Sequence, residues 1–269
     1  MVARARSHGP IAGFTVVGTA IIVATVAIYP SSVERLLLPC SWPRLMVLAV
    51  LPLLALIAVA WLARLGFVLA RAALTVGRLP RTDQLPARLR TSVARTGVER
   101  VQCISSSLPI AFCAGARRPR VIVSEGLAEQ LDDRELEAVL LHERQHLRER
   151  EPVVRAACEA AAQVLVFFPL ARWWSRRRME RAELRADQAA LRRVGPRPVA
   201  AALFRLGSTI PAAAAFAGDS QLRVAQLLGD PLPTPRPAAV TVATSLIGFP
   251  FAAAVVGCAI LNIAQLLSI

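Results

Sequence analysis

Long uncharged runs flank a stretch of mixed polar and apolar residues, and this pattern divides the chain. Residues 11–29 and 45–63 are apolar runs of about 19 residues, the length at which a helix crosses a bilayer. No charged residue follows Pro237, so residues 237–269 predict a third span, where Gly248 and Pro250 suggest a kink or an interfacial stretch. The first run could also be a signal peptide, but its candidate cleavage site is poor and we favour an uncleaved anchor.

The residues between the second and third spans have the pattern of a folded domain. Val121–Val123 predicts a short strand after a turn-rich stretch. A helix should begin at Asp132, whose side chain can pair with a carboxylate three residues later, and should run to about residue 150, before Glu151-Pro152. A second helix is expected over residues 171–194, and the proline-rich residues 231–237 predict an extended linker into the last span.

Charge orients these segments. The net charge is +14 although 55% of the residues are hydrophobic, and every basic residue is an arginine. Arginines cluster directly after residue 64, whereas the loop between the first two spans holds only Arg35 and Arg44. Because basic residues concentrate on the cytoplasmic side of spans, we expect the N-terminus and residues 64–236 in the cytoplasm and the C-terminus outside. Arginines beside apolar runs indicate the bilayer as a partner, and nucleic-acid binding is not expected.

These patterns predict a mainly α membrane protein of about three transmembrane helices with a cytoplasmic α+β domain that carries a small sheet. We assign residues 1–75 to a two-span anchor, residues 76–236 to the cytoplasmic domain and residues 237–269 to a C-terminal transmembrane helix. The five cysteines are scattered and form no C-x-x-C pair, so neither a disulfide framework nor a thiolate metal site is expected.

The most informative stretch is His142-Glu-Arg-Gln-His146. Residues four apart share one face of a helix, so two imidazoles there can grip one Zn²⁺. Glu143 would project beside them, where a carboxylate can take a proton from the attacking water and pass it to the leaving amine. The motif is specific in a chain with three histidines, although a coincidence on an Arg/Glu-rich helix face is the alternative.

A catalytic zinc needs a third protein ligand, and here it should be a carboxylate because His8 lies in the N-terminal tail. Glu180, Glu183 and Asp187 follow at i, i+3 and i+7 on one face of the second expected helix. One of them can bind the metal while another orients an imidazole through its free N–H. Taken singly, each could instead be a salt-bridge partner for the many arginines.

Together, H-E-x-x-H at 142–146 and Glu183-Leu-Arg-Ala-Asp187 resemble the gluzincin pattern of the HtpX-like/CAAX prenyl proteases and the BlaR-type membrane metallopeptidases. The BlaR type is the closer match. Three further stretches resemble its motifs: residues 119–127, residues 167–174 and Arg223-Val-Ala-Gln-Leu-Leu228. The resemblance covers about residues 80–235. It implies a zincin-like (gluzincin) domain with one zinc per chain, Glu183 as its third ligand and Asp187 as the partner of a zinc histidine. Glu180 remains a second candidate for such a supporting role.

Two departures from that family bear on function. In BlaR-type sensors a penicillin-binding domain follows the last span, and a fourth span is common. This sequence ends at its last expected span and has three expected spans. We therefore do not expect beta-lactam sensing by this polypeptide. The apolar segment 156–170 is interrupted by Glu159 and Gln163. Were it to span, His146 and Glu183 would lie on opposite sides of the membrane, so we interpret it as an interfacial or packed helix.

The leading hypothesis is a membrane-anchored zinc endopeptidase that hydrolyses a protein substrate on the cytoplasmic side, which by resemblance would be a transcriptional repressor. The alternatives are an HtpX-like protease for membrane-protein quality control and a catalytically silent membrane regulator. A peptidase also needs a donor for the oxygen that becomes negative on the scissile carbonyl. Tyr29 lies in the first expected span and His8 in the N-terminal tail, so neither is expected to reach the site. Arg223 is therefore the candidate by elimination, with a plain salt bridge as its alternative.

Overall fold

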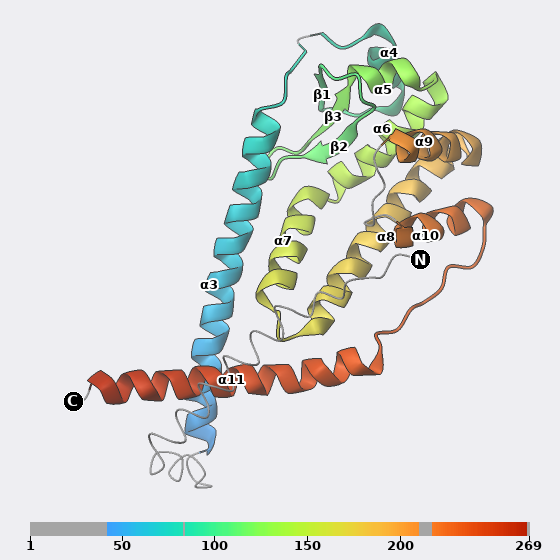
Figure 1. The fold of residues 1–269 in the computed structure, drawn as a ribbon. Coiled ribbons are helices and arrows are strands. Elements are labelled where there is room, and N and C mark those ends of the chain that lie inside the picture. Colours follow the sequence, from blue (N-terminus) through green and yellow to red (C-terminus); the bar gives the residue numbers. More distant parts are fainter. Residues whose placement is uncertain (1–41, 83, 210–216, 268–269) are drawn as a thin grey trace. The chain divides into compact units, whose positions relative to one another are not determined.

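The computed structural model describes residues 42–82, 84–209 and 217–267, and its elements are mostly helices. The expected first span and its topology therefore lie outside the described residues, as do His8 and Tyr29. The elements are α3 (Trp42–Gly77), α4 (Ala87–Thr96), β1 (Val101–Ile104), β2 (Ala111–Ala114), β3 (Arg120–Ser124), α5 (Glu125–Gln130), α6 (Asp133–Arg148), α7 (Glu151–Val164), α8 (Pro169–Val194), α9 (Pro196–Thr209), α10 (Ala217–Leu228) and α11 (Ala239–Leu267) (Figure 1).

The chain forms two compact units, and three helices run from one into the other. The first unit comprises Met1–Arg64, Glu159–Ser175 and Arg236–Ile269, and the second comprises Leu65–Cys158 and Arg176–Pro235. Two helices contain stretches long and apolar enough to cross a membrane, Val50–Gly77 in α3 and Ala239–Ile260 in α11. These stretches agree with the second and third expected spans and support membrane association.

In the first unit, α11 packs closely against the turn between α7 and α8. A Cβ added to Gly248 would stand 1.8 Å from the carbonyl oxygen of Phe167, so only glycine permits this approach. Nearby, the Ser245 hydroxyl accepts a 2.9 Å hydrogen bond from the Leu170 N–H. Leu53 of α3 is buried in the same apolar cluster. The sequence suggested a kink or an interfacial stretch at Gly248 and Pro250; helix α11 continues through both residues, and the glycine permits close packing.

The apolar segment 156–170 is not one helix. It includes the end of α7 up to Val164, a turn, and the start of α8 at Pro169. Residues 165–168 of the turn belong to or pack against the apolar cluster of the first unit. A proline favours the first turn of a helix because its missing N–H would be unpaired there in any case. The sequence predicted one helix here, whereas the segment contains parts of two helices and a turn that packs in the first unit; an interfacial position of the segment stays a prediction.

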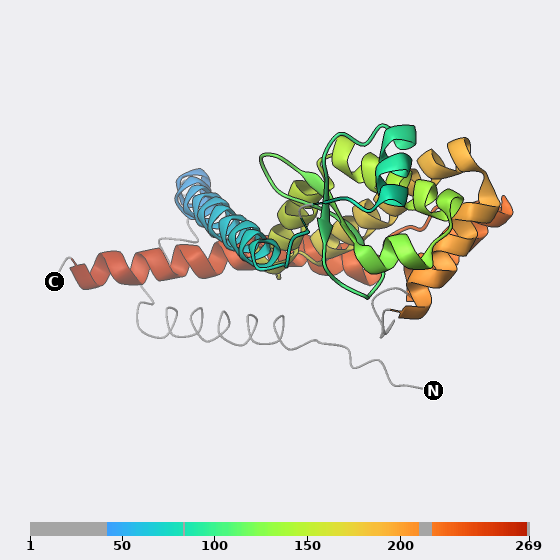
Figure 2. The ribbon, with the colours of Figure 1, turned by 90° about the horizontal axis from the view of Figure 1, so that it is seen from above.

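The second unit is built around a three-stranded mixed sheet in the order β1-β3-β2, with β1 parallel and β2 antiparallel to β3. Side chains alternate across β3: Val121 and Val123 join the core shared with α6, and Ile122 packs on the opposite face with Val76 and Leu79. Of these strands the sequence predicted only β3. Helix α6 packs against β2, β3, α4 and α9, and thus lies at the centre of this unit. Figure 2 shows the ribbon from above.

Helix α6 begins as the sequence predicted. The Asp132 carboxylate accepts a 2.8 Å hydrogen bond from the Glu135 N–H, and the Glu135 carboxylate accepts one of 2.8 Å from the Asp132 N–H. This reciprocal pair is a capping box, which satisfies two otherwise unpaired donors and stabilises the helix start. The helix ends at Arg148, and α7 starts at Glu151 with Pro152 in its first turn. The predicted second helix is also confirmed, as α8.

Candidate metal centre

Helix α6 presents the three residues of the histidine motif inside the second unit. Glu143 and His146 are buried, and the side chain of His142 is 15% exposed. The two imidazole rings lie edge to face, with their centroids 4.7 Å apart, and the two Nε2 atoms are separated by 3.0 Å. Leu136 and Leu140 on the same helix are fully buried in the core, and this packing holds the helix in place.

Helix α8 supplies two carboxylates one turn apart. Glu183 lies with Oε2 3.5 Å from His142 Nε2 and Oε1 3.8 Å from His146 Nε2. Asp187 is 1% exposed and its Oδ1 lies 2.9 Å from His142 Nδ1. Because Asp187 occupies Nδ1, the Nε2 atom of His142 is directed toward His146 and Glu183. The structure therefore brings both carboxylates beside the two imidazoles.

The three donor side chains lie close enough together to share one metal ion. His142, His146 and Glu183 each offer one ligand atom, and these atoms all lie within 4.8 Å of one another. A tetrahedral Zn²⁺ with bonds of about 2.0–2.1 Å separates its ligand atoms by about 3.3 Å. The two Nε2 atoms are 3.0 Å apart, and the two carboxylate oxygens of Glu183 lie 3.5 Å from His142 Nε2 and 3.8 Å from His146 Nε2, so each contact is close to the spacing that a shared ion requires. Two imidazoles and one carboxylate are also a donor set that catalytic zinc sites use.

Two arginines from other helices contact these carboxylates. Arg223 of α10 donates from Nε and one terminal nitrogen to the two oxygens of Asp187, at 2.6 and 2.7 Å. Its other terminal nitrogen is 3.8 Å from Glu183, and its side chain is 15% exposed. Arg155 of α7 lies 3.1 Å from Glu183 Oε1, with a side chain that is 53% exposed. Both guanidinium groups therefore lie at the cluster, one enclosed and one open to solvent.

Burial and charge shift the pKa values of these groups. Burial by itself would lower the pKa of His142, but hydrogen bonds to Asp187 and Glu183 raise it to about 9. Burial and the nearby charge of His142 lower the pKa of His146 to about 4. Burial would raise the pKa values of Glu183 and Asp187, but the hydrogen bond of each to His142 brings both below their usual range.

Glu143 is distinguished from the other carboxylates of the cluster because its pKa is raised, chiefly by burial. A carboxyl group whose pKa moves toward neutrality is suited to accept and return a proton. Cys113 on strand β2 lies near it: burial first, and then the charges of Glu143 and Glu151, raise the pKa of this thiol to about 12. Strand β2 packs against α6, and Cys113 lies close enough to Glu143 for that charge to act on the thiol.

Glu180 is the one predicted site residue that the structure does not bring into the cluster. It is buried on α8, and its carboxylate pairs with Arg177 three residues earlier on the same helix. Arg155 and Cys113 were missed by reasoning from the sequence. Arg155 is one of 32 basic residues and lies outside the motifs, so no local signal could have singled it out.

A comparison with protein families agrees with this geometry. The sequence model described as BlaR1 peptidase M56 matches residues 16–200, a range that includes His142, Glu143, His146, Glu183 and Asp187 but ends before Arg223. No match is found among curated proteins. The match extends over more than half of the chain, includes the candidate ligands and covers the first of the two membrane-length stretches. The chain therefore belongs to the BlaR1 peptidase M56 family, a family of membrane metallopeptidases.

Proposed function

We propose that this protein is a zinc-dependent endopeptidase in which His142, His146 and Glu183 hold one zinc ion and Glu143 is the general base. The observation that carries the proposal is a set of three ligand atoms within 4.8 Å of one another, next to a buried carboxylate of raised pKa. Membership of a metallopeptidase family supports the same chemistry. When bound, zinc supplies a Lewis acid that polarises the scissile carbonyl and acidifies the attacking water.

The proton transfers fall to Glu143. As a carboxylate it takes a proton from the attacking water, and as a carboxylic acid it returns that proton to the amine that leaves the broken peptide bond. Its burial favours the exchange because a low-dielectric site disfavours the charged form and brings the pKa closer to neutrality. The other carboxylates of the site are kept ionised by hydrogen bonds, which separates the role of base from the role of ligand.

Asp187 and Arg223 hold the histidine in position. Asp187 bonds to His142 Nδ1, and the paired Arg223 fixes the carboxylate in a bidentate arrangement. Such outer contacts fix the tautomer and the orientation of a metal-binding imidazole. Two nitrogens of Arg223 bind Asp187, which favours a positioning role for this residue. Its third nitrogen lies near Glu183, so Arg223 also remains a candidate donor to the substrate.

Arg155 is the second candidate for stabilising the oxygen that becomes negative on the scissile carbonyl. Its guanidinium touches Glu183 through one terminal nitrogen, and half of the side chain is open to solvent. A donor to substrate must be reachable from the side on which substrate enters, and the enclosed Arg223 meets this requirement less well. We therefore propose Arg155 as the donor, and keep Arg223 as the alternative that the same variants test.

The substrate is proposed to bind as an extended segment along β2. Among the described residues, β2 pairs with β3 along one edge only, and its Cys113 lies close to Glu143. An open strand edge recognises an extended peptide through main-chain hydrogen bonds, whatever the side chains. This mode suits a protein substrate on the cytoplasmic side, where a repressor in a signalling system is our preferred class. A membrane-protein quality-control protease and a silent regulator remain the alternatives.

The decisive experiment measures metal and activity together in the purified full chain. Elemental analysis should find about one zinc per chain in the wild type and in Glu143→Gln, and little in His146→Ala. Glu143→Gln should abolish cleavage of an unfolded protein substrate because the amide cannot accept the proton. A wild type without zinc, or with zinc but without any peptidase activity, would contradict the proposal and favour a silent regulator.

Orientation requires its own test. A reporter that functions only in the cytoplasm should be active when it is inserted after Gly115, in a loop of the second unit. A reporter inserted at the same place that functions only outside the membrane should remain inactive. The opposite result would place the second unit outside and would exclude a cytoplasmic repressor as substrate.

A further inference from the structure

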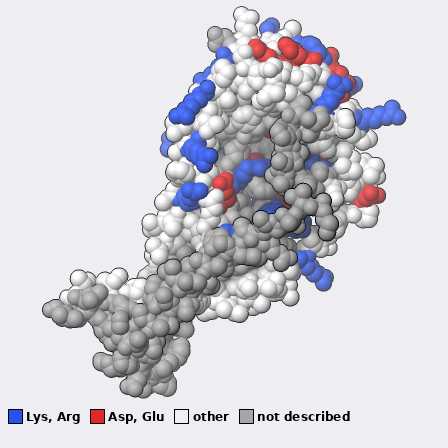
Figure 3. All heavy atoms as spheres, viewed as in Figure 1, with Lys and Arg blue, Asp and Glu red and all other residues white. Residues whose placement is uncertain are grey.

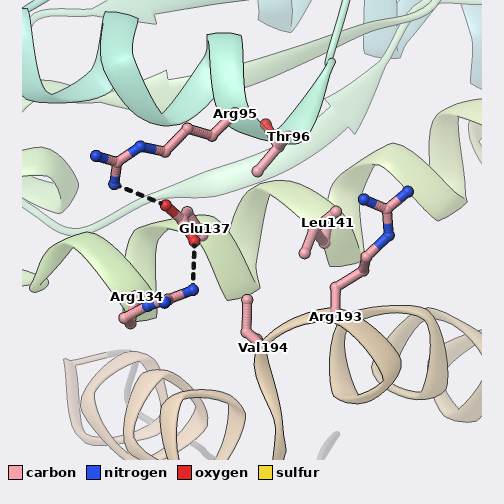
Figure 4. A pocket seen from close by; sticks show the side chains of 7 residues that line it. All are labelled: Arg95, Thr96, Arg134, Glu137, Leu141, Arg193 and Val194. Atoms are coloured by element: carbon pink, nitrogen blue, oxygen red, sulfur yellow. Dashed lines mark hydrogen bonds and ion pairs between the residues drawn. The ribbon is translucent and has the colours of Figure 1, made fainter.

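A second group of charged residues lies on the same helix pair, beyond the metal cluster. It lines a pocket of about 410 Å³ between the last turn of α4 (Arg95, Thr96), the first half of α6 (Arg134, Glu137, Leu141) and the last turn of α8 (Arg193, Val194) (Figure 4). Leu141 directly precedes His142, and Arg193 follows Asp187 by less than two helical turns. Neither the proposed reaction nor the family assignment uses this pocket.

The pocket carries more positive charge than its own residues neutralise. Its lining has three guanidinium groups against one carboxylate. Glu137 is the carboxylate: Arg95 approaches one of its oxygens at 3.1 Å and Arg134 the other at 3.4 Å, so both oxygens are used (Figure 4). The guanidinium of Arg193 forms no ion pair or hydrogen bond within the described part of the chain.

The surroundings add to this charge. Arg144 donates a 2.9 Å hydrogen bond to the carbonyl oxygen of Thr96 at the pocket edge. Burial, and then the charges of Arg148 and Arg193, lower the pKa of Arg144, and Glu99 only partly offsets them. More generally, basic side chains outnumber acidic ones on the face of the molecule in Figure 3. The charge of Arg193 therefore acts on Arg144 at the edge of the pocket.

We propose that this pocket binds a phosphate group. An anion here would offset the excess positive charge of the lining. It would also accept hydrogen bonds from N–H groups of Arg95, Arg134 and Arg193 that are not otherwise used. Arginine suits phosphate because its planar fork of donors matches the phosphate oxygens, and charge-assisted bonds of this kind are about twice as strong as neutral ones. Leu141 and Val194 provide the apolar part of the lining, so a small and strongly charged ligand fits better than an apolar one.

A bound phosphate would join the two helices that carry the metal ligands. Between the pocket and the metal cluster, Ala138, Leu141 and Ala190 are buried in one apolar cluster, so α6 and α8 are packed together there. A ligand that contacts Arg134 on α6 and Arg193 on α8 stabilises this arrangement by mass action, because the unfolded chain does not offer the site. The inference goes beyond the proposed peptidase function and does not depend on it.

The test is anion binding by the full chain in detergent, free of zinc and of phosphate. Pyrophosphate and inorganic phosphate should raise the midpoint of thermal unfolding above the value in sodium chloride of equal ionic strength. Titration calorimetry should show that Arg193→Ala weakens pyrophosphate binding about tenfold, as expected for one charge-assisted contact. Arg192→Ala is the matched control, since Arg192 is also exposed, one position earlier on α8, but does not line the pocket.

Two outcomes would overturn the proposal: an unfolding midpoint that moves no more than in sodium chloride, or equal losses of affinity in Arg192→Ala and Arg193→Ala.

A separate experiment identifies the source of the phosphate group. If it is a lipid headgroup, the wild type in nanodiscs of anionic phospholipid should bind pyrophosphate more weakly than in nanodiscs of neutral phospholipid. If it is a soluble phosphate compound, the two affinities should agree. None of these measurements uses peptidase activity. The phosphate-binding proposal can therefore be refuted while the proposed metal centre stands, and the proposed metal centre can be refuted while phosphate binding stands.

Discussion

Replacing Asp187 by asparagine should reveal how the metal centre is supported. Asp187 is 1% exposed and accepts three hydrogen bonds, one from His142 Nδ1 at 2.9 Å and two from Arg223 at 2.6 and 2.7 Å. An asparagine of the same shape has no charge, and its NH₂ group cannot accept. One substitution therefore disturbs both the orientation of a proposed metal ligand and a buried ion pair.

The two effects have different magnitudes. Loss of the partner of a metal-binding histidine reduces metal affinity by about 10- to 100-fold, or about 1.4–2.7 kcal/mol. Removing one member of a buried ion pair destabilises a fold by about 3–5 kcal/mol because the other charge stays buried without compensation. The side chain of Arg223 is 15% exposed and lies 3.8 Å from Glu183, so we expect a loss near 3 kcal/mol, at the lower end of that range.

A double variant separates these effects. Asp187→Asn combined with Arg223→Met leaves no uncompensated charge in the pair, and replacement of both members of a buried pair is often neutral for stability. The free energy of unfolding should therefore recover most of the lost 3 kcal/mol or so. His142 still lacks its carboxylate acceptor, so the affinity for zinc should remain about 10- to 100-fold below that of the wild type.

The assays are zinc competition against a chromophoric chelator and chemical unfolding of the metal-free protein in detergent, each on the wild type and both variants. Wild-type zinc affinity in Asp187→Asn would show that Asp187 does not orient the ligand. Recovery of zinc affinity in the double variant would show that the single variant acted only through the fold. Unchanged stability in the single variant would mean that Arg223 finds another partner.

Two further predictions concern substrate binding and packing. Arg155→Gln should lower kcat by about 10²-fold, with zinc retained and a smaller change in KM. If instead Arg223→Ala lowers kcat by about 10²-fold with zinc retained and Arg155→Gln has a mild effect, Arg223 is the donor. Gly126→Ala should destabilise the fold by about 1–3 kcal/mol, because the new Cβ would stand 2.1 Å from the Ser107 carbonyl oxygen. Gly66→Ala, where nothing lies within 4 Å, is the control, and equal unfolding midpoints of the two variants would refute this reasoning.

The sequence by itself determined the features that depend on neighbours within a few residues. His142, Glu143 and His146 share a helix face because residues four apart always do, and the capping box at Asp132 needs only the carboxylate three positions on. The same local reasoning predicted α8 and the two membrane-length stretches. It could also name Glu180, Glu183 and Asp187 as a set, since all three lie on one side of α8.

Only the tertiary structure decided how that set is used. Glu183 and Asp187 meet α6 across 37 to 45 positions of the chain, and Glu180 instead pairs with Arg177 on its own helix. Arg155 reaches the site from α7 through a side chain that resembles every other arginine in the sequence, and the contact of Arg223 with Asp187 depends on the packing of α10. Strands β1 and β2 are four residues each, too short to show alternation, and exist because β3 offers them hydrogen bonds. Contacts between distant segments depend on packing, which no local pattern encodes.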